Sequence, residues 1–405
     1  MSREHRSAGD RWNDLDAARS ILMMLGVVLH AANLYAEPQD WLVGDPPGRR
    51  AFALLSGGIH VFRIPAFFVI AGFFAGFSLE RYGAAEFLRR RLRRLVVPLV
   101  SAAVLLSTVQ SWILYRHGTT GYGPAGGGDL GLVPFLGSPW FRDGLAEGAW
   151  VTHLWFLVHL IVYVVATWVV ALAIPRLQRA ARGTGAGGRV ARSGFFLLAL
   201  PLTAVAVDAT AKYVPHAYDR ILGVTSLQQL LDDLPYYVFG VVAYRARSLF
   251  EGLRAPGAWV VPALALSIAA ERLLPDEPRG LTQNVVAVYV DDLTVWLSIA
   301  VVLAGFRAIA SRPSRVFTYL SEASYTVYLF HHLCVIALGL ALVGTGLGPL
   351  AKFGLVVSMT LAATLALHHF VVLRVPWIRL AFNGRWGIPV RSAVEGDEAS
   401  PPSAR

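Results

Sequence analysis

The segment DLDAARSILMMLGVVLHAANLY, residues 14–35, decides the fold, because it is a long apolar run with few polar side chains. Arg19 and His30 lie eleven residues apart in it, so a helix places both on one face with a rise of about 16 Å between them. Placing these two polar side chains against lipid costs free energy, so this face of the helix must meet protein or water. Two interpretations are open: a snorkelling arginine with a packed histidine, or a site where Arg19 holds an anion and His30 accepts a proton.

The composition indicates a polytopic membrane protein. Of the 405 residues, 55% are hydrophobic and 15% are charged, and the mean hydropathy is +0.53. The net charge of +10 does not predict nucleic-acid binding here, because the arginines lie between apolar runs, as membrane topology requires. The single cysteine, Cys334, argues against a disulfide framework and a thiolate metal cluster, and no metal site is expected.

The apolar runs predict an all-α bundle of about ten transmembrane helices. They are expected at residues 15–36, 58–79, 95–115, 151–174, 194–213, 234–249, 257–274, 285–306, 322–343 and 349–373. The transmembrane domain then covers 15–373, between a cytoplasmic segment 1–14 and a cytoplasmic tail 374–405 that is partly disordered after Trp386. The polar loop 116–150 has room for a short helix around 139–149.

The arginine distribution predicts the orientation. Most of the 36 Lys and Arg residues fall in alternate connections, at 81–94, 176–192, 245–254, 307–315 and from 374 onward. Cytoplasmic loops of membrane proteins are enriched in these residues. Both termini are therefore expected in the cytoplasm.

The segment EFLRRRLRRLVVP, residues 86–98, has more arginines than topology alone needs. It is expected to be a loop that ends at the start of the third span. Arg91 and Arg94 are three residues apart and would share a helix face. Two forked guanidinium groups on one face suit phosphate groups.

Further polar residues fall inside the predicted spans, namely Arg63, Asp208, Asp291, Asp292, His331, His332, His368 and His369. Each alone is explained by an interhelical hydrogen bond, or by snorkelling in the case of Arg63. Together they indicate a polar cavity across the membrane. Gly26, one turn before His30, is expected to leave room for a ligand chain beside the histidine.

Taken together, these residues resemble the membrane acyltransferase-3 family over about residues 12–373. The matching features are Arg19 with His30, FFVIAGFF at 67–74, Arg91 with Arg94, HLWFL at 153–157 and SYTVYLFHH at 324–332. Within the family the chain is most similar to the glucan biosynthesis protein C type, which adds succinyl groups to periplasmic glucans. Ala71 stands where many members have serine, so no serine is assigned a role there.

The resemblance implies a multi-pass enzyme of the bacterial inner membrane that moves an acyl group from cytoplasmic acyl-CoA to an extracytoplasmic carbohydrate. Succinyl-CoA or acetyl-CoA would be a co-substrate, with no bound cofactor. Arg19, Arg91 and Arg94 would hold the phosphates of CoA, and His30 would be catalytic. The expected acceptor or cavity residues are His331, His153, Asp291 and Arg63, and the imidazole of His30 would be oriented by Asp16, Glu322 or another deep histidine.

Two other functions fit the residues. Arginines at a cavity mouth and buried histidines also suit a proton-coupled transporter of an organic anion or an acylated glycan. No internal repeat is visible, which counts against a transporter. A structural partner of a glucan synthase is the third function, and it leaves the intramembrane charges unexplained.

Overall fold

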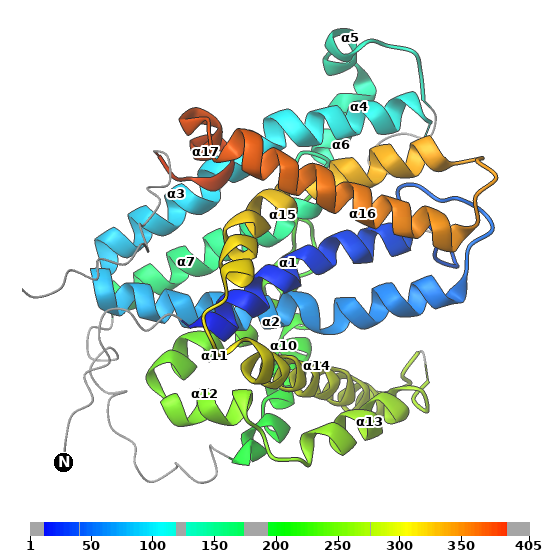
Figure 1. Cartoon of the computed structure of the whole chain (residues 1–405). Helices are drawn as coiled ribbons and strands as arrows, with labels where there is room; N and C mark the ends of the chain where they lie inside the picture. Colours follow the sequence, from blue (N-terminus) through cyan, green and yellow to red (C-terminus); the bar gives the residue numbers. More distant parts are fainter. Residues whose placement is uncertain (1–11, 40, 119–126, 174–192, 276, 387–405) are drawn as a thin grey trace, which may run out of the picture.

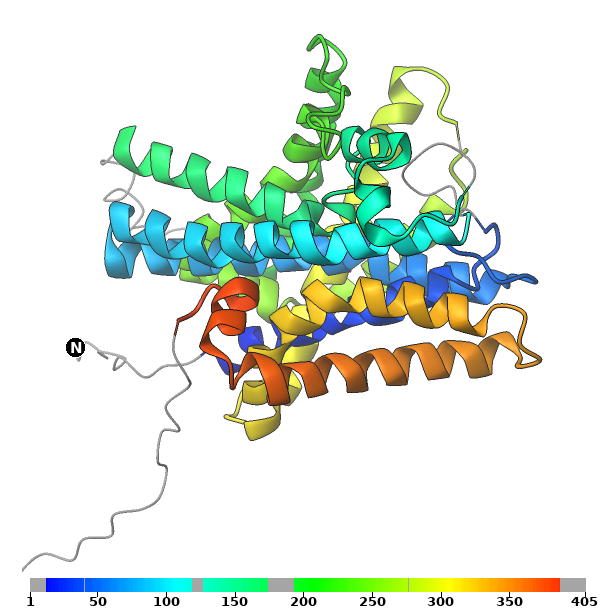
Figure 2. The ribbon, with the colours of Figure 1, turned by 90° about the horizontal axis from the view of Figure 1, so that it is seen from above.

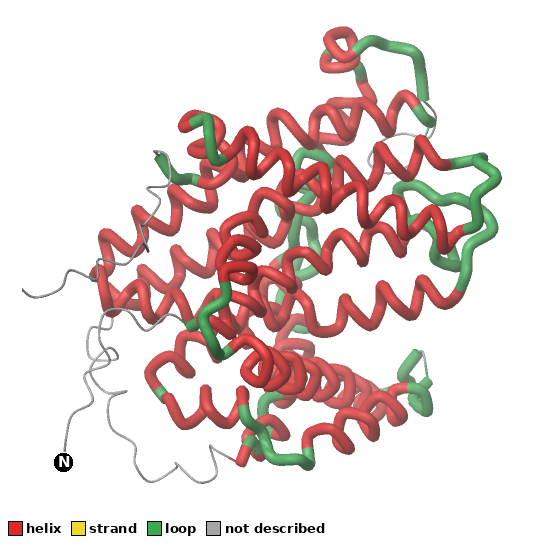
Figure 3. Tube along the Cα trace, in the orientation of Figure 1, coloured by secondary structure: helices red, strands yellow, loops and turns green. Residues whose placement is uncertain are grey.

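The computed structural model describes residues 12–39, 41–118, 127–173, 193–275 and 277–386. Within these ranges the chain is helical, with two isolated bridges and no β-strand (Figure 1 and Figure 3). The predicted all-α fold is confirmed. The expected disorder after Trp386 and the arginine cluster at 176–192 lie outside the described residues.

In the described part of the chain, seven helical segments are long and apolar enough to cross a membrane. They are α1 (Asn13–Asn33), α2 (Arg50–Tyr82), α3 (Ala84–Ala102) continued by η1 (Ala103–Ser107) and α4 (Thr108–Arg116), η2 (Thr152–Leu154) with α7 (Trp155–Ala173), α14 (Leu281–Ala310), α15 (Arg315–Leu342), and α16 (Pro349–Leu367) with η4 (His368–Val372). Each overlaps one predicted span, so a multi-pass membrane protein is supported.

Three predicted spans correspond to shorter or more polar helices. They are η3 (Phe195–Leu198) with α10 (Pro201–Ala211), α11 (Leu227–Arg245) and α13 (Val260–Glu271). A crossing helix needs about 20 apolar residues, which α10 and α13 do not reach, and α11 begins with a polar stretch. Ten crossings and the orientation remain predictions.

The arginine run is helical, so the expected loop at residues 86–98 is wrong. Gly83 separates α2 from α3 with φ of 76°, a conformation that glycine adopts without steric cost. In the first turn of α3, Glu86 pairs with Arg89 at 2.7 Å and with Arg90 at 2.5 Å. Such pairs stabilise a helix, and the arginines therefore continue directly into the third span.

Four short helices complete the bundle. α5 (Leu132–Leu136) and α6 (Pro139–Ala146) lie between α4 and α7, and α6 confirms the short helix predicted near 139–149. Ser138 caps α6 by accepting a hydrogen bond from the backbone nitrogen of Phe141 at 3.2 Å. α12 (Arg247–Arg254) packs on α14, and α17 (Pro376–Asn383) extends the bundle beyond residue 373 by packing on α3.

The first predicted span is the central helix of the bundle (Figure 1). α1 contacts α2, α14, α15 and α16, and Figure 2 shows α15 and α16 side by side next to it. Of its 21 residues, 12 are buried. The face with Arg19 and His30 therefore meets protein and internal cavities.

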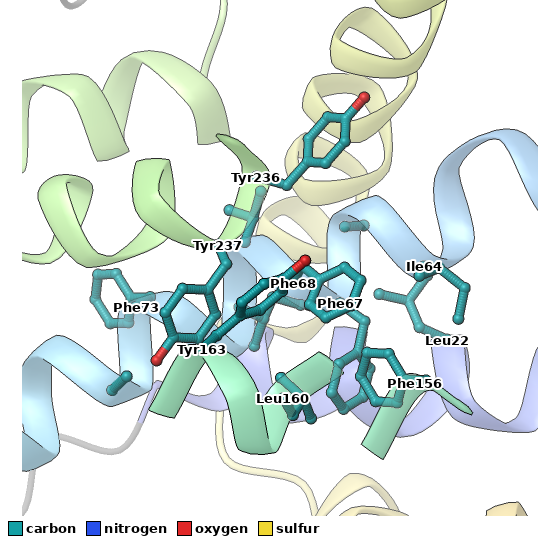
Figure 4. Packing of buried hydrophobic residues seen from close by; sticks show 14 of the residues in the cluster. Leu22, Ile64, Phe67, Phe68, Phe73, Phe156, Leu160, Tyr163, Tyr236 and Tyr237 are labelled. Atoms are coloured by element: carbon teal, nitrogen blue, oxygen red, sulfur yellow. The ribbon is translucent and has the colours of Figure 1, made fainter. Parts of the chain in front are cut away.

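α2 and α11 approach closely through two glycines. A Cβ atom at Gly72 would lie 2.0 Å from the carbonyl oxygen of Tyr237, and one at Gly240 would lie 2.1 Å from that of Val69. Small residues let membrane helices pack backbone against backbone. Figure 4 shows the aromatic side chains that fill the space around this contact, among them Phe67, Phe68, Phe73, Tyr163 and Tyr237.

Buried ion pairs join α1 and the loop after it to distant elements. Near the start of α1, Arg254 donates to Asp14, and beyond its end Lys352 of α16 donates to Asp45 at 2.6 Å. Both pairs are almost completely buried. Removing one partner would leave an uncompensated charge, which costs about 3–5 kcal/mol.

The glycine contact predicts which substitutions in α2 and α11 damage the fold. Gly72→Ala or Gly240→Ala should lower the free energy of unfolding by about 1–3 kcal/mol, because the methyl group meets backbone that cannot move away. Denaturant titration of purified protein in detergent measures this. Gly57→Ala, in α2 like Gly72 but with nothing within 4 Å of its Cβ position, is the matched control and should not lower stability, because alanine favours a helix more than glycine does. Equal stability of all three variants would contradict the packing.

The predicted orientation can be tested at the two ends of α15. In a Cys334→Ala background, Arg312→Cys should resist an impermeant thiol reagent in intact cells, because Arg312 precedes α15 at the arginine-rich end. Gly346→Cys, after α15, should react. Both positions are exposed, so a lack of labelling would not result from burial of the side chain within the protein. Labelling of position 312 from outside would show that the orientation is opposite to the predicted one.

Candidate functional site

A hollow of about 550 Å³, here called the basic vestibule, lies where α1 begins, α2 ends and α3 begins. Arginines dominate its lining, and they are Arg19, Arg89, Arg90, Arg91, Arg93, Arg94, Arg379 and Arg385. Glu86 is the one carboxylate among its lining residues. Such a concentration of guanidinium groups favours a multiply charged anion.

The three arginines predicted to bind phosphate lie together in this vestibule. Arg19 donates to Asp16 at 3.1 Å and to the hydroxyl of Ser321 at 2.8 Å. Arg91 donates to the hydroxyl of Ser78 at 3.2 Å. Among the described residues, Arg91 and Arg94 have no ion pair with a carboxylate. Their charge is therefore available to a ligand.

An apolar channel of about 160 Å³ continues from the vestibule into the bundle. It shares Arg19, Phe74, Arg91, Arg94 and Arg385 with the vestibule. Its apolar walls are formed by Met23, Phe67, Ala71, Leu95, Phe156, Leu157, Leu160 and Val164. Its other lining residues are Tyr237, Ser321, Glu322, Ser324, Tyr325 and Asn383. A channel with cations at its mouth and apolar walls suits a ligand with a charged head and a long uncharged arm.

A third hollow of about 240 Å³, here called the histidine chamber, lies beyond the channel and shares Phe156 with it. Its lining includes His30, His60, Arg63, His153, His331 and His332. The ring centroid of His30 lies 5.3 Å from that of His331 and 4.7 Å from that of His332. The ring of His153 stacks on His332 at 4.6 Å. The structure thus brings four predicted residues together: His30, Arg63, His153 and His331.

The backbone of α15 fixes the protonation of two of these rings. The carbonyl of Tyr328 only accepts hydrogen bonds, so His331 donates Nδ1–H to it at 2.7 Å and His153 donates Nε2–H at 3.1 Å. The hydroxyl of Thr152 lies 3.1 Å from Nδ1 of His153, and Thr152 has an unfavourable φ of 46°. Nδ1 of His30 is buried and has no hydrogen-bond partner.

Gly26 does not leave open space, which corrects the prediction made for it. A Cβ atom there would lie 2.9 Å from Nη1 of Arg63 and 3.1 Å from Nε2 of His331. The missing side chain lets these two groups reach α1 one turn from His30. The position therefore admits protein groups from α2 and α15 where a ligand chain was expected.

The structure does not bring Asp291 to the chamber. Its side chain is exposed on α14, and it is not among the residues that line the chamber. The two carboxylates proposed to orient His30 also have other partners. Asp16 accepts from Arg19, and Glu322 accepts from Arg379 at 3.3 Å. The groups beside His30 are other imidazoles and Trp41, whose ring stacks on it at 5.6 Å.

Sequence reasoning missed several lining residues. Trp41 precedes α2 in a loop, and Arg385 follows α17, so neither belongs to a span whose pattern could reveal it. His60 opens the second predicted span together with Arg63, but the sequence assigned it no role. Trp41 and Leu42 also line an open groove of about 480 Å³, here called the Trp41 groove, on the far side of the chamber from the channel.

Another buried histidine lies outside these cavities. Nδ1 of His159 on α7 lies 2.9 Å from Asp233 of α11, and its Nε2 lies 2.7 Å from the hydroxyl of Thr225. No described hollow reaches these atoms, so the network ties α7 to α11 and to the loop before it. In the described part of the chain, no three His, Cys, Asp or Glu side chains converge as metal ligands.

The chain is similar to proteins of a known family. The chain matches the acyltransferase-3 family, described as an acyltransferase domain, over residues 12–369. It is 25% identical over 382 residues to "Glucans biosynthesis protein C" of Salmonella gallinarum, covering 92% of this chain and 94% of that protein. The proteins of that name from Shigella dysenteriae and Escherichia coli K12 are each 26% identical over 385 residues, with the same coverage.

No solved structure matches the chain. The family match, by contrast, spans nearly every described helix, from the residue before α1 to the π-helical turn after α16. It includes every segment that lines the chamber and most of those that line the vestibule and the channel, whose remaining walls come from residues 379–386 beyond the match. The chain belongs to the acyltransferase-3 family of membrane acyltransferases.

Proposed function

We propose that this protein is an O-acyltransferase that moves a succinyl or acetyl group from cytoplasmic acyl-CoA to an extracytoplasmic carbohydrate such as a periplasmic glucan. One observation supports this most strongly. The vestibule, the channel and the chamber follow one another along a single face of α1, at Arg19, Met23 and His30. The names of the curated relatives support a glucan as the acceptor.

Arg19, Arg91 and Arg94 would bind the phosphates of CoA in the vestibule. Arg91 and Arg94 face the cavity without a carboxylate partner among the described residues, and Arg385 lies beside them. The uncharged pantetheine arm would enter the apolar channel. Its length is comparable to the ~16 Å rise between Arg19 and His30, so the thioester would reach the chamber.

The arginine-rich vestibule faces the cytoplasm in this proposal, because positive charge gathers on the cytoplasmic side of membrane proteins. The Trp41 groove would then open to the other side of the bilayer. An acceptor sugar would enter through that groove and meet the acyl group in the chamber, where His153 and His331 offer polar atoms. The inner membrane of a bacterium fits both the donor and the acceptor.

His30 would perform the chemistry by one of two routes. As a general base it would take the proton of the acceptor hydroxyl while that oxygen attacks the thioester carbon. As a nucleophile it would take the acyl group itself, its proton passing to the CoA sulfur, and then release the acyl group to the acceptor hydroxyl. The second route lets an acyl group cross the membrane while CoA stays in the cytoplasm.

A transfer assay tests the proposal and separates it from transport. Purified protein is incubated with labelled succinyl-CoA or acetyl-CoA and with an acceptor glucan. An acyltransferase links the label covalently to the glucan. A carrier, reconstituted in vesicles, would move the labelled compound without forming that bond, and a structural partner of a synthase would do neither.

The vestibule arginines give a binding prediction. Arg91→Ala and Arg94→Ala should each weaken CoA affinity tenfold to a hundredfold, because a charge-assisted contact contributes about 1.5–3 kcal/mol. Isothermal titration with CoA measures the change. Arg142→Ala, which removes an exposed arginine of α6, is the matched control. CoA affinity that stays at the wild-type value in both vestibule variants would remove these residues from the site.

His30 gives the activity prediction. His30→Gln keeps hydrogen bonding but cannot take up a proton or an acyl group, so transfer should be abolished while the melting temperature and CoA affinity stay near wild type. His369→Gln, on the exposed surface of the η4 turn, is the control and should transfer normally. Appreciable turnover by a folded His30→Gln protein would refute the catalytic role of His30.

A further inference from the structure

We propose that Arg63 is a catalytic residue, whose guanidinium group stabilises the negative charge that forms on the acyl carbonyl oxygen during transfer at His30. This inference rests on the proposed acyltransferase activity. It assigns a second group to the reaction and names the atom on which that group acts.

Arg63 is a buried cation that has no hydrogen-bond or ion-pair partner among the described residues. It lies within the second membrane-length helix, with 8% of its surface exposed. Its Nε atom is buried without a hydrogen-bond partner, and no described carboxylate forms an ion pair with it. The residues that line the histidine chamber include no Asp or Glu. The chamber therefore contains one permanent positive charge that no described side chain neutralises.

The guanidinium group lies at the position where the acyl carbonyl would be held. Nη1 of Arg63 packs against Gly26, one helical turn from His30 on the same face of α1. Helical side chains lean toward the N-terminus of their helix, so the imidazole of His30 leans toward Gly26 and Arg63. Nε2 of His331 approaches the same glycine, and Arg63 thus lies among the imidazoles.

An unpaired cation in such a place is costly, and an anion that forms during the reaction would offset this cost. Fixed charge aimed at a developing oxyanion in a water-poor site is a large source of rate enhancement. A free carboxylate on the acyl group is the other anion that could meet Arg63. The position beside His30 favours the carbonyl oxygen, because the carbonyl carbon must contact the attacking atom whichever acyl group is used.

The charge balance holds for both routes through His30. Attack on the thioester carbon, by a ring nitrogen of His30 or by the acceptor oxygen, moves the carbonyl electron pair onto oxygen. Collapse of this oxyanion breaks the carbon–sulfur bond, and the sulfur leaves with the proton that His30 releases. In the acyl-histidine route a second oxyanion forms when the acceptor hydroxyl attacks. Its collapse breaks the bond between the acyl carbon and the histidine nitrogen, and His30 takes the hydroxyl proton. Arg63 would contact every one of these oxyanions and would itself exchange no proton.

The test compares Arg63→Gln and Arg63→Lys with wild type, using acetyl-CoA and succinyl-CoA in parallel. Loss of one oxyanion contact lowers kcat by about 100- to 1000-fold, so the Gln variant should lose this factor with both thioesters. Arg63→Lys keeps the positive charge but not the forked guanidinium group, so its kcat should fall by a smaller factor. CoA affinity measured by titration should not change in either variant, since Arg63 lies outside the vestibule. Arg116→Gln, at the exposed end of α4, is the control.

The outcomes separate this inference from the proposed function. Normal transfer by Arg63→Gln, or a loss confined to succinyl-CoA, would overturn the oxyanion role, and the second result would make Arg63 a carboxylate-binding residue. Absence of transfer by the wild type with both thioesters would reject the proposed function itself. Should the Gln variant not fold, Arg63→Ala with added methylguanidinium decides: restored turnover with both thioesters supports the role, and no restoration counts against it.

Discussion

The low dielectric of the bilayer is the constraint on which the structure depends, because every charged or polar group within the bundle must meet protein, a cavity or an opposite charge. Some charges are neutralised directly, as in the buried pairs Arg254–Asp14 and Lys352–Asp45. Arg63, Arg91 and Arg94 instead face hollows without a carboxylate partner among the described residues. The paired charges stabilise the packing of the bundle. The charges without a carboxylate partner indicate where a charged ligand or intermediate fits.

α1 connects these hollows because its inward face changes character along its length. Arg19 lies in the vestibule, Met23 in the channel and His30 in the chamber. The other walls come mainly from α2, α3, α7 and α15. Gly26 admits Arg63 and His331 to α1, and Gly72 with Gly240 brings α11 against α2. The cavity path is thus a consequence of close helix packing around one central helix.

The chamber differs from the vestibule in the state of its polar groups. Two of its imidazoles are held by the carbonyl of Tyr328, which defines which nitrogen has the proton. His30 has no such partner at Nδ1 and is flanked by Trp41 and by other imidazoles. A ring that is not committed to a structural hydrogen bond is free to exchange a proton or a group, which is why the proposed chemistry centres on it.

The sequence by itself determined the all-helical fold class, the seven long apolar segments and the shared face of Arg19 and His30. Those features follow from hydrophobicity and from the fixed rotation of about 100° per residue along one helix. It also indicated Arg91 and Arg94 as a pair, although it placed them in a loop, because Glu86 and Gly83 act only through local geometry that a charge count overlooks. Only the tertiary structure decided that Arg63 reaches Gly26, that Trp41 folds back onto His30 and that Asp291 stays outside. The physical reason is that contacts between residues far apart in the sequence depend on how the helices rotate and tilt against one another. Close packing at a few glycines and loops sets those angles.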